Sequence, residues 1–69
     1  MRPEPFDRYE AALRKLSKDH RETVVMRLDL GYSYAQIASA MGKSTDAARM
    51  TVARALVELA KAMHDHREG

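Results

Sequence analysis

Apolar residues recur at steps of three and four through most of this 69-residue chain, which is the spacing of one face of an α-helix. Serine and glycine residues, which start and end helices, interrupt the pattern at short intervals. Residues 1–5 contain two prolines and are predicted to form a flexible lead, and residues 64–69 a polar tail. The intervals between predict an all-α fold of four helices with a long last helix, over residues 6–16, 18–30, 34–41 and 45–63.

The same spacing predicts which side chains face the core. Ala38 and Ala48 are small, which allows the third and fourth helices to cross closely. The predicted core residues are Phe6, Tyr9, Ala12, Leu13 and Leu16 in the first helix, Val24, Val25 and Leu28 in the second, Ile37, Ala38 and Met41 in the third, and Ala48, Val52, Ala55, Leu56 and Leu59 in the fourth.

The segment from residue 33 to residue 54 has the signals of a helix-turn-helix. Ser33 and Gln36 have the spacing of a capping box, in which two side chains satisfy free amides at a helix start. Gly42 ends this short helix where a positive φ is needed. Ser44 then caps the fourth helix, and Asp46 complements the helix dipole in its first turn. The sequence therefore predicts a helix-turn-helix without winged elements, whose second helix enters the major groove of double-stranded DNA.

The face of the fourth helix opposite its core residues predicts the DNA-binding site. Arg49 suits a bidentate contact to guanine, and Met50 and Ala53 can pack on a thymine methyl group. The free amides at the helix start suit a phosphate. The alternative for Arg49 is a surface ion pair with Asp46 or with a more distant acidic residue. The predicted DNA-binding residues are Lys43, Ser44, Thr45, Asp46, Arg49, Met50, Ala53 and Arg54.

Beyond Arg54 the same stripe continues with apolar residues, so this helix is hydrophobic around most of its circumference. Such a helix is generally buried on more than one side. We expect Val57, Ala60 and Met63 to bind a partner or a second copy of the chain. The alternative is that the first helix folds over them completely.

Composition narrows the function classes. Twelve basic and ten acidic residues leave a net charge of +2, so DNA affinity is expected to be modest and sensitive to salt. There is no cysteine and no apolar run long enough for a membrane span, which makes the cytoplasm the expected compartment. No cofactor motif, metal-ligand cluster or nucleophile with a neighbouring base is evident, so we expect a non-enzymatic protein without cofactors.

Six runs of the sequence, taken together, form a specific pattern: ALRKLS (12–17), RETVVMRL (21–28), GYSYAQIA (31–38), MGKS (41–44), AAR (47–49) and ARAL (53–56). With these runs the chain resembles, from Ala12 to Met63, region 4 of bacterial sigma-70 family sigma factors, and is most similar to those of the extracytoplasmic-function type. The chain departs from that pattern at Ser17, Gln36, Met50 and Thr51, where the family often has proline, an acid, a small polar residue and arginine.

This resemblance implies a last helix that reads the −35 promoter element and earlier helices that dock on the β-flap of RNA polymerase. It also implies anti-sigma proteins and activators as partners. Nothing in the chain corresponds to region 2, so an excised domain and a small stand-alone protein both stay open. Two other functions stay open as well: a homodimeric regulator of a two-fold operator, and an interaction module for polymerase or an anti-sigma protein with little DNA contact.

Overall fold

The computed structural model describes the backbone of residues 5–66 and the side chains of residues 7–64. Within these residues the fold is all-α, as predicted, and contains no strand. A π-helical turn, η1, directly continues α2. The elements in chain order are α1 (Pro5–Arg14), α2 (Lys18–Val24), η1 (Val25–Asp29), α3 (Tyr34–Met41) and α4 (Thr45–His66).

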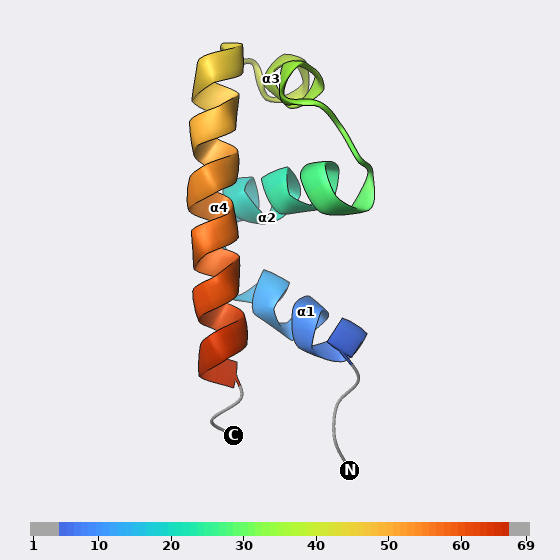
Figure 1. Ribbon diagram of the computed structural model, residues 1–69, viewed down its shortest axis with the longest axis vertical. Helices are drawn as coiled ribbons and strands as arrows, with labels where there is room; N and C mark the ends of the chain where they lie inside the picture. Colours follow the sequence, from blue (N-terminus) through green and yellow to red (C-terminus); the bar gives the residue numbers. More distant parts are fainter. Residues whose placement is uncertain (1–4, 67–69) are drawn as a thin grey trace.

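Helix α4 is the longest helix, and the other helices are arranged along it (Figure 1). Its 22 residues span about 33 Å at the usual helical rise. The three shorter helices pack against it on one side, with α3 beside its N-terminal end, α2 beside its middle and α1 beside its C-terminal end (Figure 1). The opposite side of α4 is therefore left to solvent. None of the described helices is long and apolar enough to cross a membrane.

Two apolar clusters hold the shorter helices against α4. Leu56, half-buried in α4, packs against both clusters and joins them. The first cluster fixes α1 and α2 to the C-terminal half of α4 through Ala12, Leu13, Leu16, Val24, Ala55, Leu59 and Ala62. The second fixes α3 to the N-terminal half through Ile37, Ala38, Ala48 and Val52.

The predicted caps account for most of the helix boundaries. Ser17 Oγ accepts a hydrogen bond from the His20 amide at 3.3 Å, at the start of α2. Gly31, which follows η1, has a φ of +69°. Three boundaries of α1 and α4 differ from the prediction. Helix α1 ends at Arg14 rather than at residue 16. Helix α1 begins at Pro5, because proline lacks the amide that a first helical residue leaves unpaired, and α4 runs to His66 rather than ending near Met63.

The single helix predicted over residues 18–30 is interrupted. The Leu30 amide donates to Val25 O at 3.0 Å, a bond across five residues that closes the π-helical turn. The wider turn changes the phase of the side chains that follow, so Leu28 is 51% exposed, and its prediction as a core residue is wrong. The core also contains two threonines that were not predicted, Thr23 and Thr51.

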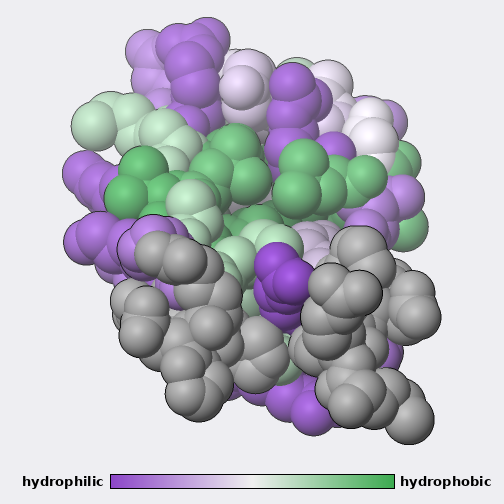
Figure 2. Space-filling view, turned by 60° about the horizontal axis from the view of Figure 1, so that its bottom comes forward, coloured by the Kyte–Doolittle hydropathy of each residue, from purple (hydrophilic) through white to green (hydrophobic). Residues whose placement is uncertain are grey.

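Apolar residues form a band across the face seen in Figure 2, with polar residues above it and at both sides. Four large apolar side chains are more than half exposed: Leu28 in η1, Leu30 after it, and Met50 and Val57 on α4. Both features leave apolar surface that the described residues do not cover.

Candidate nucleic-acid interface

The connection between α3 and α4 has the geometry of a helix-turn-helix. Ser33 Oγ accepts from the Gln36 amide at 3.1 Å, and Gln36 Oε1 accepts from the Ser33 amide at 2.8 Å, so the capping box is confirmed. Gly42 has a φ of +69° at the end of α3. Ser44 Oγ accepts from the Ala47 amide at 3.1 Å at the start of α4. The turn is therefore closed at both ends by the residues predicted to close it.

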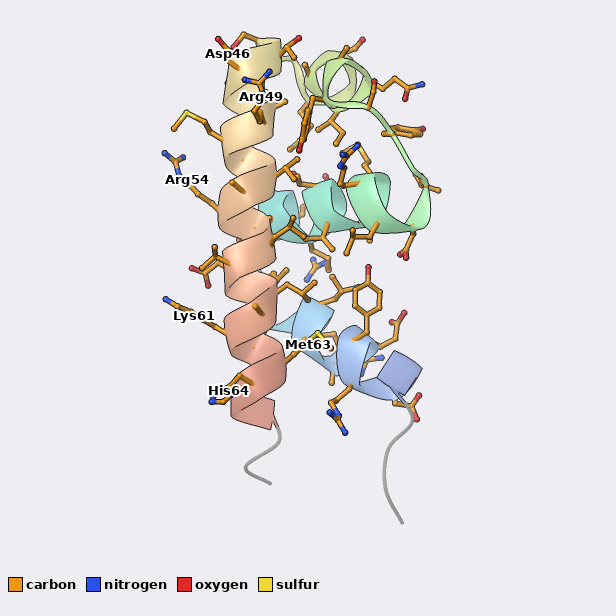
Figure 3. The ribbon with its side chains drawn as sticks, viewed as in Figure 1. Asp46, Arg49, Arg54, Lys61, Met63 and His64 are labelled. Carbon is orange, nitrogen blue, oxygen red and sulfur yellow. The ribbon has the colours of Figure 1, made fainter. Side chains whose placement is uncertain are left out.

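Close packing of α3 on α4 places the start of α4 at one end of the molecule. Ala38 and Ala48 are both buried in the second cluster, as predicted. Ile37 and Val52 fill the space around them and are almost completely buried. With this side of α4 occupied, the residues on its other side project outward (Figure 3).

Seven of the eight predicted DNA-binding residues are exposed on that outward side: Ser44, Thr45, Asp46, Arg49, Met50, Ala53 and Arg54. They extend over the first three turns of α4 and the residue before it. Met50 is 54% exposed, which is unusual for a large apolar side chain. The face predicted from the helical spacing is thus a continuous exposed surface.

Lys43 is the exception. It is half-buried, and its Nζ donates a hydrogen bond to Thr51 Oγ1 at 2.9 Å. Thr51 in turn donates to Ala47 O at 2.9 Å, and only 7% of Thr51 is exposed. The Lys43 ammonium therefore lies against α4 within the protein. For Lys43 to contact a phosphate as predicted, its ammonium group must donate through the two protons that Thr51 does not accept, or its bond to Thr51 must break.

Arg49 is partly restrained by its neighbours. Its Nη1 donates to Asp46 Oδ1 at 3.0 Å, so the ion pair considered as an alternative is present. Its Cζ also lies 5.6 Å from the centroid of the Tyr34 ring. The side chains of Arg49 and Asp46 remain 56% and 86% exposed. An exposed pair of this kind contributes about 0.2–0.5 kcal/mol, which leaves the guanidinium able to bind another group.

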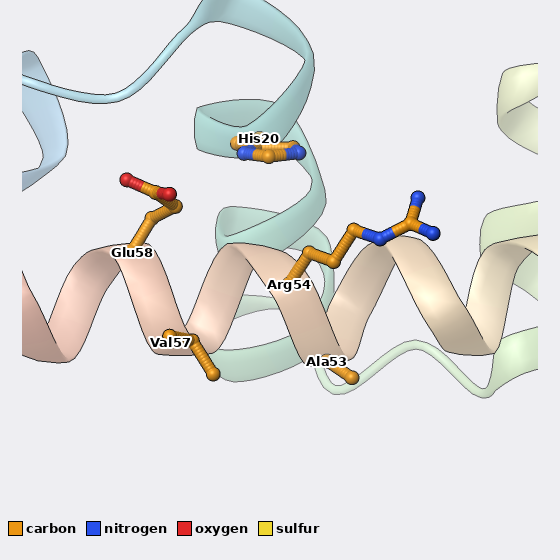
Figure 4. Close-up of a pocket in the computed structure, with 5 residues that line it drawn as sticks. All are labelled: His20, Ala53, Arg54, Val57 and Glu58. Atoms are coloured by element: carbon orange, nitrogen blue, oxygen red, sulfur yellow. The ribbon is translucent and has the colours of Figure 1, made fainter.

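Arg54 borders a small hollow beside α4. Ala53 and Val57 line its apolar side, and His20 of α2 lies above α4 between Arg54 and Glu58 (Figure 4). The volume of the hollow is about 320 Å³. No hydrogen bond or ion pair of Arg54 is found among the described residues, so its charge is presented to solvent.

The predicted partner surface is divided by the structure. Val57 is 56% exposed, and Ala60 is exposed one turn further along α4. Met63 instead is half-buried and packs against the first cluster, which holds α1. The exposed apolar strip of α4 therefore consists of Met50, Ala53, Val57 and Ala60 and does not include Met63.

Comparison with known families agrees with this geometry. A family model for sigma-70, region 4 matches residues 6–59, which include all of α1 but its first residue, all of α2, η1 and α3, and most of α4. The chain belongs to the sigma-70 region 4 family. No curated protein and no solved structure matches the chain. A region 4 domain is a DNA-binding module of promoter recognition that works with RNA polymerase, and the exposed start of α4 is the part of this domain that suits DNA.

Two residues of this region 4 domain have roles that the sequence did not indicate. The ring of Tyr34 lies near the guanidinium groups of Arg27 and Arg49. Thr51 was not assigned to the site, and it holds Lys43. No signal in the sequence connects these partners, because each pair is brought together by the turns between helices. Within the described part of the chain, no group of three or more His, Cys, Asp or Glu side chains could hold a metal ion.

Proposed function

We propose that this domain recognises a −35 promoter element through the first three turns of α4. The observation that carries the proposal is the exposure of the whole outward face from Ser44 to Arg54 on a helix anchored by its opposite face. A helix held in this way can enter the major groove without rearrangement of its core. The function is recognition, and we propose neither catalysis nor a cofactor.

The side chains of this face suggest a division of roles. Arg49 is the residue proposed to contact guanine, because a guanidinium can donate to both acceptors on the major-groove edge of that base. Met50 and Ala53 are proposed to contact thymine methyl groups. Ser44 and Thr45 at the helix start, with Arg54 to the side, are proposed to contact phosphates.

The test is selection of DNA duplexes from a random library at low salt, followed by affinity measurements on the selected duplexes. Arg49→Ala is expected to reduce discrimination at one guanine position by about 1–3 kcal/mol. Lys61→Ala is the matched control, because it removes one exposed positive charge from the same helix, two turns past Arg54. If Arg49→Ala selects the same sequences with the same preference as the unmodified protein, the recognition face is wrongly placed.

We propose that the β-flap of RNA polymerase docks beside α2 and η1. Leu28 and Leu30 are 51% and 57% exposed there. Val25 and Met26 contribute the apolar part of a hollow of about 390 Å³. Exposed leucines beside such a hollow suit the apolar face of a partner segment. Leu28→Asp is expected to weaken binding of a β-flap fragment, whereas Met50→Asp, on the DNA face, is expected to leave it unchanged.

The exposed apolar strip of α4 is proposed to bind an acidic partner such as an anti-sigma protein. Arg54 and Lys61 flank Val57 on this face and are both exposed. A second copy on the strip would bring these cations together, whereas an acidic partner would neutralise them. Sedimentation equilibrium of the chain alone is expected to show a monomer. A homodimer broken by Val57→Asp would instead favour the independent regulator of a two-fold operator.

A further inference from the structure

The guanidinium of Arg49 is contacted from two helices. Asp46, one turn earlier in α4, accepts a hydrogen bond from Nη1 at 3.0 Å. Tyr34, the first residue of α3, presents its ring 5.6 Å from Cζ, within the range of a cation–π interaction. One partner therefore restrains an edge of the group, and the other restrains its position relative to α3.

The Tyr34 ring is itself supported. It is half-buried and packs against the second apolar cluster. The Cζ of Arg27 lies 4.5 Å from the ring centroid, and Arg27 Nη1 donates to Tyr32 O at 2.8 Å. Arg27 belongs to the π-helical turn, whose altered phase places its side chain toward the start of α3. The contacts thus connect η1, α3 and α4 around one ring.

The contact with Asp46 leaves one edge of the Arg49 guanidinium, with two hydrogen-bond donors, available to bind DNA. Nη1 is the terminal nitrogen on the Cδ side of the guanidinium, so Nε and Nη2 form the other, side-on pair of donors. Within the described residues, neither Nε nor Nη2 of Arg49 makes a recorded hydrogen bond. Two adjacent donors in this arrangement match the two acceptors of guanine in the major groove.

We propose that Tyr34 and Asp46 are positioning residues that hold Arg49 with its Nε and Nη2 donors directed outward, so that Tyr34 of α3 sets the base preference of α4 without contacting a base. The proposal rests on the proposed function, since it takes Arg49 as the guanine-reading residue. An arginine side chain loses rotamer entropy when it is fixed. Because Arg49 is already restrained in the free protein, it loses less of this entropy when the DNA complex forms.

The test compares substitutions at Tyr34 on the duplexes selected by the unmodified protein. Tyr34→Leu removes the ring and is expected to lower the preference for the guanine read by Arg49 by about two- to fivefold, the value of one exposed cation–π contact. Tyr34→Phe keeps the ring and is expected to keep the preference. Tyr32→Leu is the matched control, because Tyr32 packs against the same cluster and its ring contacts no cation among the described residues.

Two further measurements separate positioning from a loss of structure. In an Arg49→Ala background, Tyr34→Leu is expected to change the base preference no further, because the residue on which it acts is gone. In the free protein, the NMR signals of the Arg49 side chain are expected to show a ring-current shift that Tyr34→Leu abolishes and Tyr34→Phe retains.

Asp46→Asn tests the second positioning residue. It is expected to raise affinity for every duplex, by removing a negative charge, while lowering the guanine preference.

The outcomes distinguish the two proposals. If Arg49→Ala removes a guanine preference but Tyr34→Leu leaves it intact, Tyr34 is not a positioning residue and the proposed function stands. If Arg49→Ala changes no preference, the recognition face itself is wrong. If Arg49 shows no ring-current shift in the free protein, the positioning contact is overturned whatever the DNA measurements give.

Discussion

The ammonium of Lys43 donates to the hydroxyl of Thr51 at 2.9 Å, which joins the turn before α4 to the second turn of that helix. Thr51 also donates to Ala47 O at 2.9 Å, so its hydroxyl uses both of its hydrogen-bonding functions. The two residues are eight positions apart, and the turn at Gly42 brings them together. This bond makes Lys43 part of the packing of the turn as well as a candidate phosphate contact.

Thr51→Val removes both hydrogen bonds of the hydroxyl and is expected to lower the free energy of unfolding by about 2 kcal/mol, at the usual net value of about 1 kcal/mol for each bond. Valine has nearly the same shape, so the buried volume is kept. Urea denaturation followed by circular dichroism measures the change. Because the variant releases the Lys43 ammonium, DNA affinity is expected to stay the same or to rise.

Lys43→Met tests the same bond from the other side. The effects of Lys43→Met and Thr51→Val are expected to be non-additive, since each removes the same contact. Lys61→Met is the matched control on an exposed lysine of α4 without a recorded partner among the described residues. Additive effects of the two substitutions would show that the Lys43–Thr51 bond does not contribute to stability.

Ser33→Ala removes the hydroxyl of the capping box and is expected to destabilise the domain by about 1 kcal/mol. The Gln36 amide would lose its acceptor at the start of α3. Ser39→Ala is the matched control, because Ser39 is exposed within the same helix. Thermal unfolding of the two variants compares them directly, and an equal loss in both would exclude a special role of the cap.

Stability is expected to fall at alkaline pH because of Tyr9. Burial, followed by the negative charge of Asp29 and the hydrogen bond to it, raises the pKa of the Tyr9 phenol above its usual value of 10.0. Tyr9 Oη lies 3.4 Å from each carboxylate oxygen of Asp29. The folded state therefore favours the protonated phenol. This stabilisation is complete below pH 10.0 and is lost as the pH rises through the raised pKa of the folded state.

The measurement is the free energy of unfolding between roughly pH 8 and pH 11 for the unmodified protein and for Tyr9→Phe. The other tyrosines and the lysines titrate in both proteins, so their effects cancel in the difference. That difference is expected to shrink as the pH rises. A difference that is constant across the range would contradict the raised pKa.

The dependence of DNA affinity on salt concentration is expected to distinguish charged contacts from apolar contacts. Arg54→Ala is expected to reduce the slope of log affinity against log salt concentration by about 1, the value of one lost phosphate contact. Met50→Ala is expected to lower affinity for the selected duplexes and to leave the slope unchanged. Fluorescence anisotropy across a series of salt concentrations measures both. An unchanged slope in Arg54→Ala would remove Arg54 from the phosphate contacts.

Much of the fold is readable from local patterns. Helix α3 begins and ends where Ser33, Gln36 and Gly42 predict, because caps and positive φ angles act between residues a few positions apart. The buried face of α4 follows from helical spacing, and Ala48, Val52, Ala55 and Leu59 are all buried. The π-helical turn was missed, since no local pattern distinguished it from a regular helix, and Leu28 was misplaced as a result.

The sequence by itself determined the four helices, their caps, the outward face of α4 and the membership of the sigma-70 region 4 family. Those features depend on propensity, periodicity and motif spacing. Only the tertiary structure decided that Lys43 binds Thr51, that Met63 packs on the cluster of α1, and that the ring of Tyr34 lies near Arg49. Each of these contacts depends on how the turns direct one helix against another, which is set by the packing of the whole core.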